Sequence, residues 1–452
     1  MSNKSRRDFI KKTSIIAGGM SFGFAPGLSA KSYRKVLGSN DRINVGIVGF
    51  SNRAKYSLIP SFLKFKDKLN FELIGVSDIW NRRREEGSSF IQSKTSSKIY
   101  KWRNNEEMYE KNEIDAVIIS TADFQHALHT VQATEALKDV YVEKPFAETM
   151  EDARIGIESV KKSKIVFQIG SQRRSANNYH AANNYIKSGK FGDIVMVEMK
   201  WNVNQPDRWR LPKLIKEINK KDTDWKRYLM NRPYEPWNPR KYLEYRLFWP
   251  YSSGIPGQWM SHQIDTVHWF SGFKHPRSVV ANGDIYLWND GRENFDTMTA
   301  VFDYGDSKNK GFQVIYSSRF TNSAGGIKEI YYSNAGELNL KTNKVTPNGG
   351  LKAYHANKMG LEENLLNEFD LDKENTKVVT SANTGVDDMT SLHVYNWMEC
   401  VRNRKTTNGT IEAAYNHSIA NIMTTAALRT GLKATFDEGS QNVLVGGKIF
   451  KY

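Results

Sequence analysis

The feature that most constrains the fold is a regular alternation of short apolar segments with helical segments between residues 41 and 170. The apolar segments are rich in β-branched residues, as buried parallel strands are. They cover residues 43–49, 71–76, 116–119 and 140–143. Strands that alternate with helices predict an α/β fold with a doubly wound parallel sheet.

Polar residues follow these strands at the point where each one ends. Asp78 follows the second strand, Ser120 and Thr121 follow the third, and Glu143 and Lys144 end the fourth. Parallel strands bring their carboxyl ends to one edge of the sheet, where open α/β sheets bind ligands. We therefore expect a ligand site at this edge.

The first strand leads into a turn and a helix, which is the context that a dinucleotide-binding motif requires. Gly49 fills the tight-turn position, while Ser51 and Ala54 stand where the second and third glycines would be. The Ser51 hydroxyl can donate to a pyrophosphate beside the free amides at the helix start, at Asn52 and Arg53. The motif predicts a nucleotide cofactor.

Asp78 bears on which nucleotide is bound. An acid at the end of the second strand can bind both ribose hydroxyls of NAD and repel the extra phosphate of NADP. The basic run at residues 82–84 lies close by, although an exposed helical turn is its simpler interpretation. The sequence favours NAD and leaves NADP open.

Lys144 is the strongest catalytic candidate. A lysine surrounded by apolar groups at a strand end can have its pKa lowered towards about 7–8, which suits an acid or base. The bond to Pro145 can be cis and can direct the lysine side chain. By themselves Glu143, Lys144 and Pro145 would be typical of a surface turn, so their place at the sheet edge carries the interpretation.

After residue 170 the pattern changes, and few helices interrupt the predicted strands. These strands cover residues 194–201, 285–288, 298–302, 312–317 and 330–332. They predict a second α/β domain, residues 171–440, with a largely antiparallel sheet that has one open face. An irregular stretch at 204–250, rich in Trp, Tyr, Arg and Pro, is either a lid or an oligomer arm.

A helix at residues 258–269 places Gln258, His262 and Asp265 on one face by its spacing. Polar groups on an otherwise apolar helix need partners or a cleft. His262 and Asp265 provide two metal ligands without a convincing third, so no metal is predicted. The single cysteine, Cys400, excludes an internal disulfide and a cysteine metal site.

The amino terminus predicts a twin-arginine signal peptide over residues 1–30. Arg6 and Arg7 precede an apolar stretch, 14–24, and a small-residue end, 28–30. The stretch is too short for a membrane span, and a disordered basic tail is the alternative. The signal predicts export of a folded protein to the periplasm.

Composition adds an expectation about partners. The net charge is +16, but the basic residues are dispersed and form no nucleic-acid arm. The aromatic content of 12% suits stacking on sugars, although large cores would explain it equally well. The charge pattern therefore predicts no nucleic-acid partner, and the aromatic content leaves a carbohydrate partner open.

Together these segments resemble the Gfo/Idh/MocA oxidoreductases, the relatives of glucose–fructose oxidoreductase and inositol dehydrogenase. The resemblance covers nearly all of residues 41–440. It rests on residues 46–54, Ser120 with Thr121 and His126, 143–145, 170–174, 248–249, Gly254, 262–265 and 400–405.

The resemblance implies a Rossmann domain at 41–170 and a carboxyl-terminal domain whose open sheet makes oligomer contacts. It implies hydride transfer between NAD(P) and a hydroxyl of a sugar or cyclitol, with Lys144 orienting the hydroxyl and His262 as general acid/base. Further cofactor contacts would be Ser120, Thr121, His126, Glu143 and Gln172, and further substrate contacts Arg173, Gln258, Trp259 and Asp265.

Gln258 departs from the family pattern. An aspartate often stands there as the partner of the histidine, and glutamine can hydrogen-bond but cannot ionise. Either His262 works with Lys144 alone or the chemistry has changed. Three hypotheses follow: a dehydrogenase with tightly held cofactor, a redox-assisted glycosidase or lyase, and an inactive binding protein.

Overall fold

A computed structural model describes residues 41–111, 113–306, 311–372 and 386–451. The predicted signal peptide, residues 1–30, lies outside the described residues. Within the described part of the chain, no helix is both long and apolar enough to cross a membrane.

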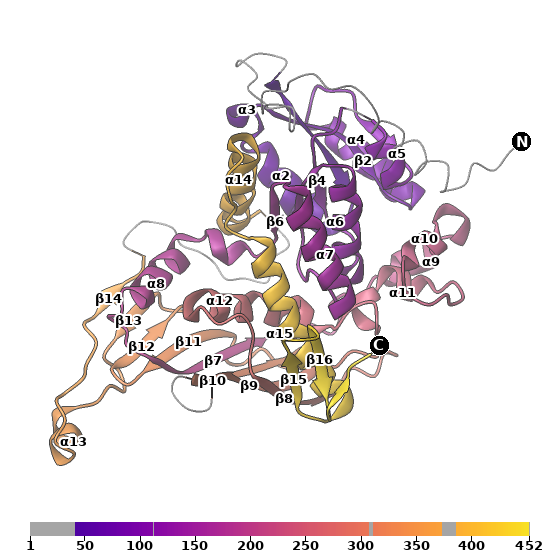
Figure 1. The fold of residues 1–452 in the computed structure, drawn as a ribbon. Helices are drawn as coiled ribbons and strands as arrows, with labels where there is room; N and C mark the ends of the chain where they lie inside the picture. Colours follow the sequence, from indigo (N-terminus) through magenta and orange to yellow (C-terminus); the bar gives the residue numbers. More distant parts are fainter. Residues whose placement is uncertain (1–40, 112, 307–310, 373–385, 452) are drawn as a thin grey trace, which may run out of the picture. The chain divides into compact units, whose positions relative to one another are not determined.

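Residues 43–169 build a six-stranded parallel sheet with the strand order β3-β2-β1-β4-β5-β6 (Figure 1). Its strands are β1 (Ile43–Val48), β2 (Phe71–Ser77), β3 (Tyr100–Trp102), β4 (Ala116–Ile119), β5 (Asp139–Val142) and β6 (Phe167–Ile169). The predicted doubly wound sheet is confirmed. The strand order reverses between β1 and β4, which is the position where such sheets open a ligand crevice.

Helical segments connect these strands, and the two faces of the sheet carry separate apolar cores. The segments are η2 (Ala54–Leu58), α2 (Ile59–Leu63), α3 (Lys66–Leu69), α4 (Asn81–Gln92), α5 (Asn105–Tyr109), η3 (Asp123–Gln125), α6 (His126–Glu135) and α7 (Met150–Ser163). The first of them, η2, is a π-helical turn directly after the β1 turn.

The second sheet has eleven strands in the order β14-β13-β12-β11-β7-β10-β9-β8-β15-β16-β17. All its pairs are antiparallel except β7 with β10. The strands are β7 (Ile194–Asn202), β8 (Ser278–Asp284), β9 (Thr297–Gly305), β10 (Gly311–Arg319), β11 (Ile327–Ser333), β12 (Gly336–Asn339), β13 (Lys344–Thr346), β14 (Phe369–Asp370), β15 (Ala434–Asp437), β16 (Asn442–Val445) and β17 (Lys448–Ile449).

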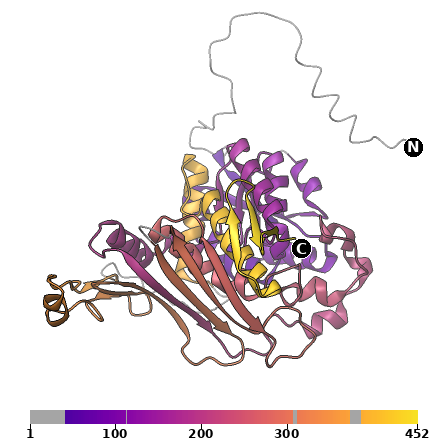
Figure 2. The same ribbon diagram turned by 60° about the horizontal axis from the view of Figure 1, so that its bottom comes forward.

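Three helices, α8 (Asn177–Lys187), α12 (Ser261–Ser271) and α15 (Ile411–Thr430), lie along one face of this sheet (Figures 1 and 2). Burial alternates along β9 and β10, with fully buried residues towards these helices and partly exposed ones opposite. The predicted, largely antiparallel sheet with one open face is confirmed.

One predicted strand, residues 285–288, is wrong. β8 ends at Asp284, and the backbone amides of Tyr286, Leu287 and Trp288 then donate to the carboxylate of Asp296 at 3.2, 2.9 and 2.9 Å. Because a side chain takes these donors, they cannot continue a ladder.

The irregular stretch at 204–250 folds into short helices that are ion-paired to the first domain. They are α9 (Pro212–Glu217), η5 (Lys220–Asp222), α10 (Trp225–Leu229), α11 (Pro239–Leu243) and η6 (Tyr245–Leu247). The pairs are Arg82–Glu217, Arg227–Glu106 and Arg232–Asp152.

Helix α14 (Asp388–Asn403) returns from the second half of the chain to the first sheet (Figure 1). Its Trp397 is fully buried, with ring centroids 6.4 Å from Phe71 and 5.9 Å from Tyr141. A further helix, α13 (Ala353–Lys358), lies between β13 and β14. The core of the first domain therefore includes a residue far along the chain.

We predict that Trp397→Ala lowers the free energy of unfolding by about 3–5 kcal/mol, because it leaves a cavity against Phe71 and Tyr141. Urea unfolding followed by circular dichroism measures the change. Tyr354→Ala, at a residue that is 68% exposed, is the control and should cost no more than about 0.5 kcal/mol. Equal losses in the two variants would contradict the role given to α14.

Candidate active site

A cavity of about 1190 Å³ lies at the carboxyl edge of the six-stranded sheet. This exceeds the usual size of a pocket for one small ligand. All sequence-predicted site residues but one line it: Gly49, Ser51, Asn52, Arg53, Asp78, Ser120, Thr121, His126, Glu143, Lys144, Gln172, Arg173, Gln258, Trp259 and His262. The exception is Asp265.

The turn after β1 requires a glycine. Gly49 has a φ of +81°, and a Cβ there would lie 2.7 Å from Thr121 Cγ2 and 3.0 Å from the Ser120 carbonyl oxygen. The next motif position, Ser51, shares a hydrogen bond with Ser120 between hydroxyl oxygens 2.6 Å apart, and accepts from the Ala54 amide at 3.2 Å. The turn is thus packed directly against the end of β4.

Asp78 is held in place by two backbone amides. The Phe50 amide donates to Oδ2 and the Trp80 amide to Oδ1, both at 2.8 Å. Burial raises the pKa of this carboxyl, and the two amides oppose that shift. Each carboxylate oxygen keeps a second lone pair, which can accept from a ribose hydroxyl.

Glu143 acts as an anchor for its neighbours. Its Oε1 accepts from Arg53 Nε at 2.9 Å and from Gln172 Nε2 at 3.3 Å. Arg53 also reaches Thr390, at the start of α14, with 3.3 Å between NH2 and Oγ1. Asn52 accepts from Arg83 at 3.3 Å.

Two buried polar atoms in the cavity wall lack a hydrogen-bond partner among the described residues. His126 Nδ1 lies 2.7 Å from the Pro145 carbonyl, so it carries the proton and leaves Nε2 as an acceptor. Burial lowers the pKa of His126, which keeps the ring neutral. Nε2 of His126 and Oγ1 of Thr121 have no hydrogen-bond partner among the described residues. With the glycine turn and Asp78, they fit a dinucleotide.

Lys144 lies between the two domains, and its bond to Pro145 is cis. Its Nζ donates to the main-chain carbonyl of Gln258 at 2.6 Å. Burial lowers the lysine pKa to about 8; nearby Arg246 and Arg53 lower it too, while Asp123 and Glu143 raise it. Near neutral pH Lys144 is therefore an ammonium group that can lose its proton.

The segment that carries His262 packs closely on Pro145. It begins with a π-helical turn, η7 (Pro256–Met260), which leads into α12. A Cβ on Gly257 would lie 3.1 Å from Pro145 Cγ and 2.7 Å from Ser253 Oγ, so a larger residue would push these side chains aside. The close contact brings Gln258 and His262 to the cavity.

His262 is a neutral base in this setting. Its ring stacks on Trp201 with centroids 5.9 Å apart. Burial lowers its pKa well below the usual value, and the positive charges of Lys144 and Arg173 add to the shift. An uncharged imidazole beside an ammonium group can accept a proton from a bound hydroxyl.

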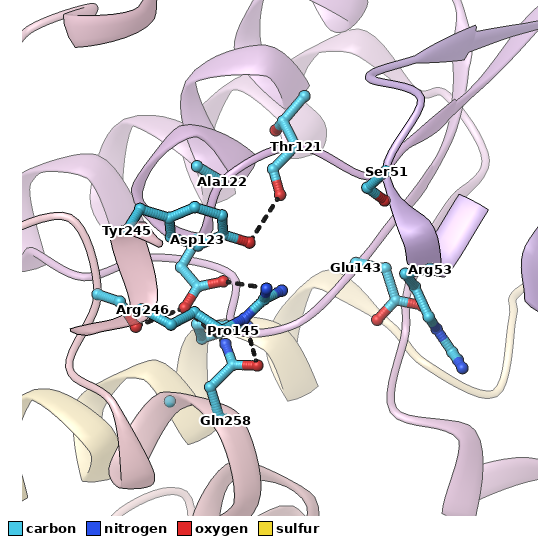
Figure 3. Close-up of polar contacts among 12 residues, drawn as sticks. Ser51, Arg53, Thr121, Ala122, Asp123, Glu143, Pro145, Tyr245, Arg246 and Gln258 are labelled. Atoms are coloured by element: carbon cyan, nitrogen blue, oxygen red, sulfur yellow. Dashed lines mark hydrogen bonds and ion pairs between the residues drawn. The ribbon is translucent and has the colours of Figure 1, made fainter. Parts of the chain in front are cut away.

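Gln258 links an acidic residue, Asp123, to a basic residue, Arg246 (Figure 3). Its Nε2 donates to Asp123 Oδ2 at 2.5 Å, and its Oε1 accepts from Arg246 Nε at 2.9 Å. Asp123 Oδ2 also accepts from Ser252 at 2.6 Å. Sequence reasoning missed Asp123, although it follows the β4 edge by four residues; Arg246, in the irregular stretch, offered no signal.

Asp265 is turned away from the cavity. Arg174 donates to both of its oxygens at 2.7 and 3.0 Å, and His417 lies 3.8 Å away. Burial would raise the Asp265 pKa, but Arg174 and His417 hold it well below its usual range. His262 and Asp265 lie three residues apart on α12, but only His262 lines the cavity, because Arg174 binds the Asp265 carboxylate elsewhere.

Other predicted residues have structural partners as well. Arg173 is ion-paired with buried Glu329, and Trp259 stacks on Trp201 with an interplanar angle of 8°. Among the described residues, no cluster of three His, Cys, Asp or Glu side chains is arranged to hold a metal ion.

Residues 43–171 match the model of the Gfo/Idh/MocA family, described as an oxidoreductase family with an NAD-binding Rossmann fold. Oxidoreductase P35 of Formosa agariphila is 29% identical over 160 residues, 35% of this chain and 47% of that protein. Inositol 2-dehydrogenase of Salmonella typhimurium is 31% identical over 131 residues, 28% and 39% of the two chains. The match thus spans less than half of these relatives.

Solved structures extend the likeness of fold to both domains. A levoglucosan dehydrogenase complex with NADH and levoglucosan has a TM-score of 0.63 at 13% identity, covering 87% of this chain and 99% of that one. The WlbA dehydrogenase of Bordetella pertussis, in complex with NADH and UDP-GlcNAcA, has a TM-score of 0.61 at 15% identity, covering 88% and 99%. Residues 43–171 of this chain are thus similar to the NAD-binding Rossmann domain of the Gfo/Idh/MocA oxidoreductase family.

Proposed function

We propose that the protein transfers a hydride between a nicotinamide cofactor and a hydroxyl of a sugar, glycoside or cyclitol. This proposal is supported by one observation: Lys144 and the neutral His262 line the same cavity as the turn at Gly49. The names of the relatives, an inositol dehydrogenase and a levoglucosan complex, support the substrate class.

NAD supplies the hydride acceptor when it is bound. His262 takes the proton of the substrate hydroxyl, and the Lys144 ammonium group stabilises the alkoxide that develops. The carbonyl of Gln258 fixes Lys144 Nζ, so the donor is aimed before substrate arrives. Asp78 binds the ribose hydroxyls and favours NAD over NADP.

The cofactor is held tightly in this proposal. The segment 204–250 lines the cavity and is ion-paired to the Rossmann domain through Glu217, Arg227 and Arg232. A retained cofactor favours a second candidate, a redox-assisted glycosidase or lyase. Transient oxidation would acidify a neighbouring C–H bond, allow elimination of the leaving group and then be reversed.

Two further proposals concern location and assembly. The twin-arginine motif at Arg6 and Arg7 supports export of the folded protein to the periplasm, where fresh NAD is not expected and a retained cofactor would be needed. The partly exposed face of the eleven-stranded sheet, with apolar Val195 and Val280 on its strands, supports a homo-oligomer.

We predict that denaturing the purified protein releases NAD. Incubating the native protein with glycosides, while the nicotinamide absorbance is followed, then separates the candidates. Net reduction indicates a dehydrogenase, whereas product without net reduction indicates the redox-assisted route. A protein with neither bound nucleotide nor affinity for one would be a binding protein and would contradict both.

We predict that kcat/KM declines as the pH rises above about 8, because Lys144 loses the charge that stabilises the alkoxide. Lys144→Met should lower kcat by roughly 10²–10⁴-fold. Lys144→Arg should move the decline to higher pH, since a guanidinium keeps its charge. Steady-state kinetics across pH measures these effects.

Lys161→Met is the control for this series, because Lys161 is exposed and pairs with Glu412 at 3.5 Å. It should leave the pH profile unchanged. A Lys144→Met enzyme with full activity would remove the lysine from the mechanism.

A further inference from the structure

Three tryptophans form a platform in the cavity wall next to His262. Trp201 and Trp259 stack with centroids 5.9 Å apart, and Trp209 lies 5.7 Å from Trp259. All three line the cavity. Flat rings of this kind stack on the faces of sugars, and His262 itself stacks on Trp201. This aromatic wall of the cavity is therefore suited to contact with a sugar ring.

Arg208 lies over this platform, with its guanidinium carbon 5.6 Å from the centre of the Trp259 ring. Its NH1 donates to the neutral side chain of Gln205 at 3.0 Å. Its Nε is buried and has no hydrogen-bond partner in the described part of the chain. A cation whose N–H group is left without an acceptor is costly to bury.

The other arginines that line the cavity each have a carboxylate within ion-pair distance. Among the described residues these pairs are Arg53–Glu143, Arg83–Glu86, Arg173–Glu329, Arg210–Glu244, Arg227–Glu106 and Arg246–Asp123. Arg208 makes no such pair with a described residue. It is the cavity arginine that lacks an anion.

The positive charge of Arg246 lies near that of Arg208. Burial and, to a lesser extent, the nearby guanidinium of Arg246 lower the Arg208 pKa to about 10, against a smaller opposing effect of Asp207. Arg246 NH2 lies 3.9 Å from Asp123 Oδ1, while Oδ2 of the same carboxylate accepts from Gln258 and Ser252. Of the two neighbouring guanidinium groups, Arg246 thus has a described carboxylate within ion-pair distance and Arg208 does not.

We propose that the carbohydrate substrate carries an anionic group, a uronic acid carboxylate or a sulfate ester, which binds Arg208 beside Arg246. The sugar ring lies on the tryptophan platform, within reach of His262 and Lys144. A guanidinium presents a planar fork that matches the oxygens of a carboxylate or a sulfate. This inference rests on the proposed function and names its substrate class.

The test is calorimetric titration of the purified protein with its bound cofactor. The probes are methyl glucosides, galactosides and mannosides, each as the uncharged sugar, the uronate and the 6-sulfate. In at least one series an anionic form should bind roughly 10- to 100-fold more tightly than its uncharged counterpart. The stronger of the uronate and sulfate arms identifies the anion, and added salt should weaken the preference.

Substitutions assign the preference to Arg208. Arg208→Met should abolish the preference, because it weakens binding of the anionic form far more than binding of the uncharged sugar, and Arg208→Lys should restore part of it. Arg277→Met removes the same charge at a residue that pairs with Asp303 and does not line the cavity. This control should keep the full preference. Bound nucleotide content verifies that each variant is folded.

Equal binding of charged and uncharged sugars by the wild-type protein would overturn the inference and leave the proposed hydride transfer standing. Parallel losses for both forms in Arg208→Met would also overturn it. If no form of any sugar binds or changes the nicotinamide absorbance, the proposed function fails and this inference fails with it.

Discussion

The proposed hydride transfer depends on one contact between the two domains. Lys144 Nζ binds the carbonyl of Gln258 at 2.6 Å, and Gly257 packs on Pro145 beside it. The contact gives the buried ammonium group an acceptor, and it fixes how far the helix that carries His262 stands from the Rossmann domain. The proposed acid and base therefore come from different domains that meet at this contact.

Gln258 is better understood as a connector than as a lost catalytic acid. A carboxamide has a donor and an acceptor, so it can join Asp123 to Arg246 at the same time. An aspartate at this position would face the carboxylate of Asp123, and two acids in contact would compete for a proton. The nearby carboxylate is instead that of Asp123, which accepts hydrogen bonds from Gln258 and Ser252.

The sequence was sufficient for elements that local patterns determine. Apolar β-branched runs predicted four of the six strands of the parallel sheet, β1, β2, β4 and β5, and missed the three-residue strands β3 and β6. Polar strand ends located Asp78, Thr121 and Lys144 at the cavity. β3, a three-residue strand with exposed Tyr100, lacked such a run. Asp265 was assigned to the cavity because its ion pair with Arg174, from another segment of the chain, cannot be foreseen from helical spacing. Asp123 and Arg246 meet only through tertiary packing.

The return of α14 has a consequence for how the protein matures. Ribosomes make chains from the amino terminus, and domains ordinarily fold as they emerge. Here Trp397 completes the core of the nucleotide-binding half, and Thr390 binds Arg53. We therefore expect this half to reach its full stability only after most of the chain has been made.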